Sequence, residues 1–263
     1  MKLILASAQD PAAKNIVMRL LESCDFKKSP CLTNAYVCGK VTLMTIAGEV
    51  TQITELPIDA EEVIVASRHA SELGTPTLTA HVPGEVEKMG FAEASPSTIK
   101  TALRILVEMR DKLGLTYHVS LEATHHGPTR LDVPVTFVEI GSSSEQWHDK
   151  KAGAAVAQAI MAAATLPMKC RHAIGLGGSH YAPHHTNVNL CTDIGVGHIL
   201  PKYASIDETL IEQAIVRTRG GVELLALDWK GMSSEQRRIS QRVADRLGIQ
   251  AIRTREILSW AKV

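Results

Sequence analysis

Two stretches of the sequence alternate apolar and polar residues and then end at side chains that bind metals or carry protons. In residues 117–122 the alternation has the period of two that a β-strand requires, and the run ends in a glutamate shortly before His125 and His126. Residues 135–140 repeat the pattern and include Glu139. Because ligands of open α/β sheets bind at the carboxyl ends of strands, both strands are expected to deliver such groups to one edge.

A histidine also follows each of three other predicted strands. These histidines are His69, His81 and His180. A single loop histidine is usually a polar turn residue, but four strand ends that carry histidine are difficult to obtain by chance. Imidazole and carboxylate groups together suit a zinc site, in which three protein ligands leave a position for water whose pKa falls towards about 7. Since the sequence lacks a His-Glu-x-x-His motif, the ligands would come from separate loops.

Strand and helix signals alternate along the whole chain. Ser95 and Pro96 predict the start of a long helix that Gly114 ends, and another long helix is expected over residues 145–164. This alternation predicts the α/β class: a three-layer α/β/α sandwich around a mixed, largely parallel sheet, whose strand order cannot be read from the sequence. No linker or repeat divides the chain, so residues 1–263 are expected to form a single domain.

Composition narrows the environment and the partners. With 28 basic and 28 acidic residues the formal net charge is zero, so no DNA partner is expected and any RNA must bind a local surface. The five cysteines include no Cys-x-x-Cys pair, which favours a reducing compartment and a cytoplasmic location. No apolar run approaches the length of a membrane span. A monomer of this length and hydrophobic content can bury a sufficient core by itself.

The glycine-rich stretch from Gly175 to His180 matches neither common phosphate-binding motif. A histidine stands where the dinucleotide-binding pattern needs its last glycine, and no Gly-Lys-Ser/Thr follows. The amide N–H groups of Gly177 and Gly178 are still expected to converge on a carbonyl or oxyanion, with a merely tight turn as the alternative. The serines at residues 142–144 lack the second glycine of a nucleophile elbow, which disfavours a serine hydrolase.

Several motifs together resemble the archaeal and plant type of D-aminoacyl-tRNA deacylase. They are Ser67-Arg-His-x-Ser71, Leu78-Thr-x-His81, Glu122-Ala-Thr-His-His-Gly-Pro128, Phe137-Val-Glu-Ile-Gly-Ser142 and Gly177-Gly-x-His-Tyr-Ala-Pro183. The resemblance covers nearly the whole chain. It implies a phosphorylase/peptidyl-tRNA-hydrolase-like fold, two zinc ions per subunit, and cleavage of the ester between a D-amino acid and tRNA in translation quality control.

The resemblance also indicates which positions carry the function. They are His69, His81, Glu122, His125, His126, Glu139 and His180. Two places depart from the family pattern. Glu85 stands where asparagine is expected, and His184 and His185 stand where a basic residue and a phenylalanine are expected. His184 and His185 are therefore left out of the predicted metal site.

The roles expected within this set are those of a metal-dependent ester hydrolase. Zinc would polarise the ester carbonyl and supply hydroxide, Glu122 or Glu139 would move the proton, and Arg68 would help to stabilise the oxyanion. The predicted catalytic residues are Glu122, Glu139, Arg68 and His81. The predicted zinc ligands are His69, His125, His126, Glu139 and His180.

Three alternatives stay open at this point. The first is a zinc peptidase or amidohydrolase that acts on a small substrate. The second is a non-catalytic module that binds tRNA. The third is a metal-free hydrolase in which a histidine or glutamate acts as general base on bound water.

A basic segment at the C-terminal end indicates where tRNA would lie. From Lys230 onward the sequence contains eight basic and three acidic residues. Arg238, Arg242 and Arg246 recur at every fourth position and predict a row of guanidinium groups along one helix. Lys230, Arg238 and Arg242 are therefore predicted to bind tRNA phosphates, with Lys202 as a further candidate. The alternative is a solvated helix face with ordinary salt bridges.

Overall fold

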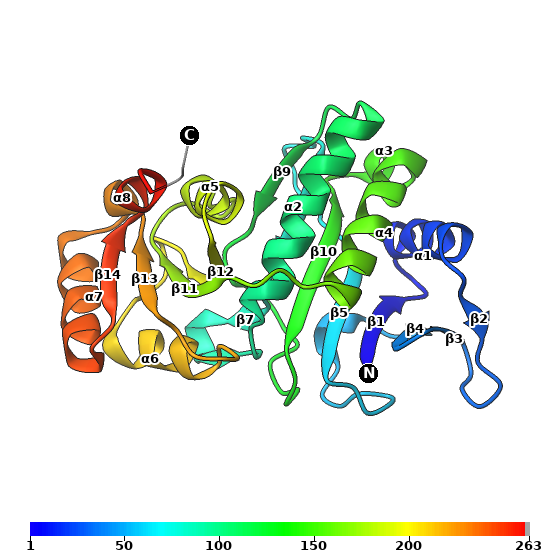
Figure 1. Ribbon diagram of the computed structural model, residues 1–263, viewed down its shortest axis with the longest axis horizontal. Helices are drawn as coiled ribbons and strands as arrows, with labels where there is room; N and C mark the ends of the chain where they lie inside the picture. The colour runs from blue at the N-terminus through cyan, green and yellow to red at the C-terminus, as the bar shows by residue number, and fades with distance from the viewer. Residues whose placement is uncertain (261–263) are drawn as a thin grey trace.

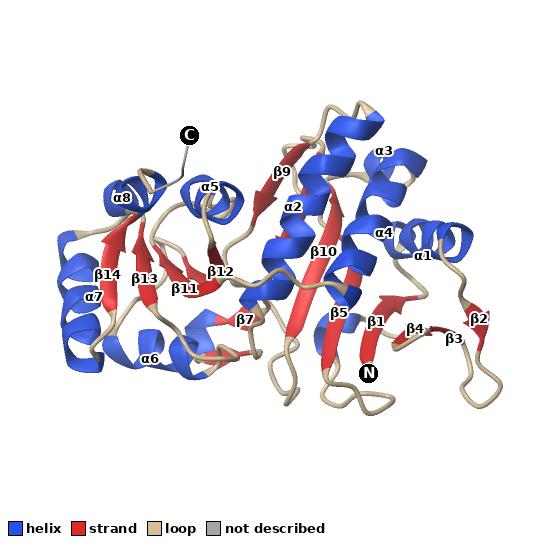
Figure 2. Cartoon of the chain, in the orientation of Figure 1, coloured by secondary structure: helices blue, strands red, loops and turns tan. Residues whose placement is uncertain are grey.

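The fold consists of two main β-sheets and the helices that cover them, and the computed structural model describes residues 1–260 (Figures 1 and 2). Lys262, one of the basic residues of the C-terminal segment, lies outside this range. The larger sheet has the order β2 (Lys27–Lys28), β3 (Ala35–Cys38), β4 (Val41–Ile46), β1 (Lys2–Ser7), β5 (Glu62–Arg68), β10 (Val135–Gly141), β6 (Thr77–His81), β9 (His118–Leu121). Because β10 is parallel to β5 and antiparallel to β6, this sheet is mixed.

The smaller sheet is entirely parallel. Its order is β12 (Ile194–Leu200), β11 (Arg171–Leu176), β13 (Leu224–Leu227), β14 (Gln250–Arg253). A short antiparallel pair, β7 (Gly84–Glu85) and β8 (Gly90–Phe91), forms the third sheet. Each crossover between the parallel strands contains a helix, as parallel pairing requires.

The helices cover the faces of both sheets. One face of the larger sheet packs against α1 (Pro11–Ser23), α2 (Pro96–Leu113) and α4 (Lys150–Thr165). The smaller sheet lies between α6 (Glu208–Val216) with α7 (Ser234–Leu247) on one face and α5 (Pro183–Cys191) with α8 (Thr254–Leu258) on the other. Shorter helical segments are α3 (Ser144–Trp147), η1 (Val50–Gln52), η2 (Val86–Lys88) and η3 (Trp229–Gly231). No helix within residues 1–260 is long and apolar enough to cross a membrane.

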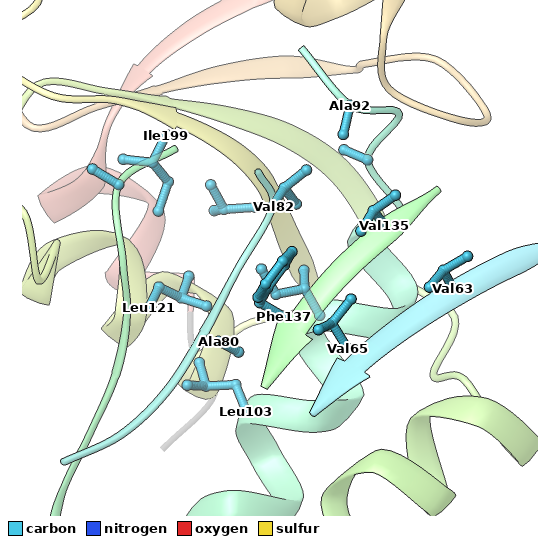
Figure 3. Packing of buried hydrophobic residues seen from close by; sticks show 14 of the residues in the cluster. Val63, Val65, Ala80, Val82, Ala92, Leu103, Leu121, Val135, Phe137 and Ile199 are labelled. Atoms are coloured by element: carbon cyan, nitrogen blue, oxygen red, sulfur yellow. The ribbon is translucent and has the colours of Figure 1, made fainter. Parts of the chain in front are cut away.

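The side chains of each strand of the larger sheet alternate between two hydrophobic cores, because successive side chains point to opposite faces of the sheet. In β1, Leu3 and Leu5 join one hydrophobic cluster, whereas Ile4 and Ala6 join the other. Phe137 is fully buried in the first cluster, where its ring packs among side chains of neighbouring strands and of α2 (Figure 3). This cluster also contains residues of the smaller sheet, so the two sheets share one continuous core.

The structure confirms the α/β class, but the strands that were expected in a single mixed sheet form two main sheets. The physical reason lies at the edge strand β9. The Leu121 N–H donates to Thr186 Oγ1 of α5 at 3.0 Å, so a helix side chain takes the position that a further strand would occupy. Strands β11 to β14 form a separate sheet, which lies beyond α5 as seen from β9.

Local signals located most helices correctly. Helix α2 starts at Pro96, and Gly114 ends it, as predicted. Gly114 follows the last helical residue and has a left-handed backbone conformation. The prediction of a single helix over residues 145–164 is wrong. The first helix ends before His148, and α4 begins as a separate helix. Asp149 caps α4 by accepting hydrogen bonds from the first-turn amides, and its other carboxylate oxygen accepts from the Tyr117 hydroxyl at 2.9 Å.

Two buried histidines outside the predicted functional set are held neutral. His198 Nε2 donates to Ala92 O at 3.1 Å, and Thr124 Oγ1, which lies 3.2 Å from His198 Nδ1, also accepts the Ile199 N–H. His185 is also fully buried. Burial lowers the pKa of both His185 and His198 to about 4.

Stability should therefore fall on acidification. The folded-state pKa of about 4 lies below the ordinary 6.5, so the unfolded chain binds more protons between these values. Each histidine therefore contributes about 3 kcal/mol to the free energy of unfolding. This contribution is complete above about pH 6.5 and is lost as the pH falls towards 4. Urea unfolding across this range should show the loss, and His198→Gln should make its pH dependence shallower. An unchanged slope in His198→Gln would contradict this account.

Candidate active site

Strands of both sheets bring the predicted functional side chains to one place. Glu139 lies on β10 and shares a face with Phe137, so the same alternation that builds the core turns this carboxyl group towards the junction of the sheets. Register places Phe137 opposite His81, and the two rings stack with centroids 5.1 Å apart. His69 follows β5, Glu122 follows β9, and His180 follows β11.

The Glu122 carboxylate is the centre of one group of side chains. It is only 1% exposed. His180 Nε2 lies 3.0 Å from Glu122 Oε2, and His69 Nδ1 lies 3.1 Å from Oε1. His125 Nε2 is 3.5 Å from Oε2. A buried carboxylate thus faces three imidazole rings that come from separate loops.

His81, His125 and His126 form a second group that adjoins the first. Two backbone carbonyl groups orient its rings, because His125 Nδ1 donates to Ala123 O at 2.8 Å and His126 Nδ1 donates to Gly127 O at 2.7 Å. The Nε2 atoms of both rings thereby carry lone pairs, and His126 Nε2 lies 3.3 Å from His81 Nε2. His126 has a φ of 43°, a left-handed conformation that lets neighbouring histidines in the chain turn their rings together, with centroids 4.3 Å apart.

These residues fit a metal ion. The donor atoms of His69, Glu122 and His180 lie within 4.8 Å of one another, as do those of His81, His125 and His126, and those of His81, Glu122 and Glu139. One buried ligand atom of this set, His81 Nδ1, has no hydrogen-bond partner. Burial lowers the pKa of His125 to about 4 and also lowers those of His81 and His126, which favours the neutral rings that metals bind.

The two glutamates differ in protonation. Burial raises the pKa of Glu139 well above its ordinary value, and the neighbouring charge of Glu122 raises it further. Burial would also raise the pKa of Glu122, but the hydrogen bonds from His180 and His69 outweigh it and hold this pKa well below the usual range. Glu122 therefore carries the negative charge, and Glu139 can hold a proton.

Supporting residues that sequence reasoning missed hold the His69 loop. The Asp10 carboxylate caps α1 through Oδ1, and its Oδ2 accepts the Arg68 N–H at 2.8 Å. Trp147 Nε1 donates to His69 O at 3.0 Å, and the Tyr181 hydroxyl lies 2.9 Å from His69 Nε2. Asp10 stands directly before Pro11, which is a local signal for a helix start, but its contact with the end of β5 joins residues that are far apart in the chain.

Arg68 lies at the rim of this cluster. Its side chain is 36% exposed, and its guanidinium carbon lies 5.8 Å from the centroid of the Trp147 ring. The nearest acidic partner is Glu49, at 3.9 Å. Arg68 is therefore accessible to a ligand that approaches from solvent.

The expected oxyanion role of the glycine-rich loop is wrong. The Gly177 N–H donates to Leu200 O at 2.8 Å, and the Gly178 N–H donates to Gly231 O at 3.1 Å, so neither amide is free for a ligand. Both glycines have a φ of 87°, and a Cβ at Gly177 would lie 2.4 Å from Met232. They are needed for a tight turn against the loop after β13, which was the alternative interpretation.

The row of arginines on α7 is paired with glutamates. Arg238 contacts Glu235, and Arg242 lies 3.1 Å from Glu208 of α6. Arg246 contacts the same Glu208 at 3.2 Å. In Figure 1 this helix lies at the outer end of the smaller sheet, beyond β14. The histidine cluster lies instead where the segments after β5, β9 and β11 meet. The geometry therefore favours the solvated face with salt bridges. Lys230 is exposed on the loop after β13.

A cavity of about 350 Å³ opens beside the second histidine group. His125 and His126 line it together with residues 84–88, Pro201 and Tyr203. A ligand in this cavity would touch the imidazole rings directly.

Fold and site together define an α/β protein with a histidine and carboxylate centre of the kind found in metal-dependent hydrolases. The D-aminoacyl-tRNA deacylase family matches residues 56–252. Curated D-aminoacyl-tRNA deacylases of Pyrococcus furiosus and Thermococcus kodakarensis are 37% and 38% identical over 96% of this chain and 100% of their own lengths. A crystal structure of a conserved protein of unknown function, AF0625, superposes with a TM-score of 0.92 at 28% identity, covering 100% of this chain and 98% of that one. The chain belongs to the D-aminoacyl-tRNA deacylase family and is an enzyme of the ester-hydrolase class.

The Asp10 contact generates a testable prediction. Asp10→Asn retains a good helix cap but presents an amide where the Arg68 N–H needs an acceptor, so the His69 loop should shift. Loss of an outer support of this kind lowers activity or metal affinity by about 10- to 100-fold. Deacylation kinetics should show the decrease. Asp207→Asn, the same change at the cap of α6, is the matched control and should leave the rate near that of the wild type.

Proposed function

We propose that residues 1–263 act as one catalytic domain that hydrolyses the ester between a D-amino acid and tRNA, and that the histidine cluster holds one or two zinc ions. Family membership supports the reaction. The single observation that supports the metal is the convergence of seven histidine and glutamate side chains in groups of three whose donor atoms lie within 4.8 Å of one another. The reaction belongs to translation, so the proposed location is the cytoplasm.

Two adjoining groups of side chains would hold the metal. His69, Glu122 and His180 form one, and His81 with His125 and His126 forms the other. His81 and Glu122, which were predicted as catalytic residues, are thus proposed as ligands as well. A zinc ion bound here would polarise a carbonyl oxygen and lower the pKa of a water ligand towards about 7.

Glu139 is the proposed proton carrier. Burial raises the pKa of this carboxyl group well above its ordinary value, so it holds a proton more readily than an exposed glutamate, which suits a group that must carry a proton to the leaving oxygen. It would take the proton of the attacking water and deliver it to the ribose oxygen as the ester bond breaks. Glu122 would stay ionised throughout and keep His69 and His180 oriented.

Arg68 is proposed to stabilise the developing oxyanion. Its guanidinium group is accessible at the rim, and its backbone N–H is held by Asp10. The Gly177 and Gly178 amides already donate to backbone carbonyl groups. Arg68 is therefore the residue of the predicted catalytic set that remains to stabilise the oxyanion.

The activity is tested with matched D- and L-aminoacyl-tRNA. The zinc-loaded protein should release the D-amino acid selectively, and equal release or no release would contradict the proposal. Glu139→Gln preserves the shape of the side chain but removes the proton carrier, so turnover should fall by about 10²- to 10⁴-fold. Glu62→Gln, at a buried glutamate that pairs with Lys2 at the start of β5, is the matched control.

The metal is tested by its content in the purified protein. Elemental analysis should find zinc, and His125→Ala with His126→Ala should lower both zinc content and turnover by more than about 100-fold, because direct ligands matter more than outer supports. His172→Ala, at a histidine on β11 outside the cluster, should lower neither. Full activity of metal-free protein in chelator would instead favour a glutamate or histidine general base. Unchanged function of the double variant would favour a binding module.

A further inference from the structure

The carboxyl edge of the smaller sheet is a second feature of the active-site region. The chain leaves β11 through α5, on the face that joins the shared core, and leaves β13 through α7, on the opposite face. The helices that follow these adjacent strands therefore lie on opposite faces of the sheet. In open parallel sheets, ligands bind beyond the carboxyl ends of the strands where the chain reverses its direction in this way.

Backbone hydrogen bonds connect the loops of this edge to the histidine cluster. The Lys202 N–H donates to Gly178 O at 3.0 Å, and the Gly178 N–H donates to Gly231 O at 3.1 Å. His180 follows Gly178 by two residues. Lys202 and Lys230, the residue before Gly231, therefore lie on loops that are bonded directly to the loop carrying His180.

The two lysines are available to a ligand. Both side chains are exposed, and within residues 1–260 neither forms an ion pair, in contrast to Arg238 and Arg242 on α7. The Lys230 loop is also held firmly. Arg237 lies over the Trp229 ring and donates to Trp229 O at 3.0 Å. The lysine therefore projects from an anchored segment.

Tyr203, which follows Lys202 in the chain, adds an aromatic ring to this region. Its side chain is 65% exposed, and its hydroxyl lies 3.4 Å from His180 Nδ1. The ring also lines the cavity that contains His125 and His126. An exposed aromatic ring beside lysines is the combination that binds unpaired nucleotides, since the ring stacks on a base and the ammonium groups neutralise phosphates.

Glu85, Glu87 and Lys88 also line this cavity, and Lys88 pairs with Glu85 at 2.5 Å. A carboxylate in the lining repels phosphate but suits the protonated amino group of an aminoacyl ester.

We propose that Lys202, Tyr203 and Lys230 bind the unpaired 3′ end of tRNA, with Tyr203 stacking on a terminal base and the lysines contacting its phosphates. This inference rests on the proposed function, because the unpaired end carries the ester. It assigns the tRNA contact to the loops beside His180 instead of the arginine row of α7.

The experiment measures binding of uncharged tRNA, and of the same tRNA trimmed to its last base pair, over a range of salt concentrations. For intact tRNA, Lys202→Ala with Lys230→Ala should make the slope of log affinity against log salt shallower by about 1.4 units, or about 0.7 for each single-stranded contact. Tyr203→Ala should weaken binding roughly ten-fold, and Tyr203→Phe should restore it, because the ring remains. With trimmed tRNA these variants should match the wild type.

The matched control is Arg238→Ala with Arg242→Ala, which also removes two charges but leaves the proposed contacts in place. Its salt slope should equal that of the wild type. The proposal is overturned if the lysine pair leaves the slope unchanged, or if its defect is the same with trimmed tRNA. Uncharged tRNA contains no aminoacyl ester, so its binding can be measured independently of hydrolysis. If the binding results are as expected but the protein does not release D-amino acids selectively, the proposed function is refuted and the proposed tRNA contact is retained.

Discussion

The buried carboxylate of Glu122 is the interaction on which the active site depends. A carboxylate removed from water costs several kcal/mol unless hydrogen-bond donors replace the lost hydration. Here the donors come from both sheets, since His69 follows β5 and His180 follows β11. The sheets must therefore stay together for Glu122 to remain ionised. The chemistry lies at their junction because that is where the charge can be paired.

Backbone bonding around β9 produces this junction. Beyond the last residue of β9 the Ala123 N–H donates to His180 O at 2.7 Å, and the Thr124 N–H donates to Ile199 O at 2.9 Å. These bonds attach the loop that carries His125 to the smaller sheet. The edge of one sheet thus becomes the connection to the other, and the histidines of the two sheets meet across it.

Much of this could be read from the sequence where the signal was local. Strands 118–121 and 135–141 and helix 96–113 lie where alternation, the Ser-Pro start and the glycine stop predicted them. The histidines were found because each follows a strand, and the family motifs pointed to the same positions. The paired amide of Gly178 and the break before α4 were missed, because the first depends on a carbonyl more than 50 residues away and the second on a contact with Tyr117.

The sequence by itself determined the α/β class, the set of loop histidines and glutamates, and the family, because periodicity and motif spacing are properties of neighbouring residues. Only the tertiary structure decided that the strands form two sheets, that Glu122 is ionised while Glu139 can hold a proton, and that the arginines of α7 are already paired. Protonation and pairing depend on distances between atoms that are far apart in the chain. A pattern of residue types carries no such distances, whereas folding fixes them.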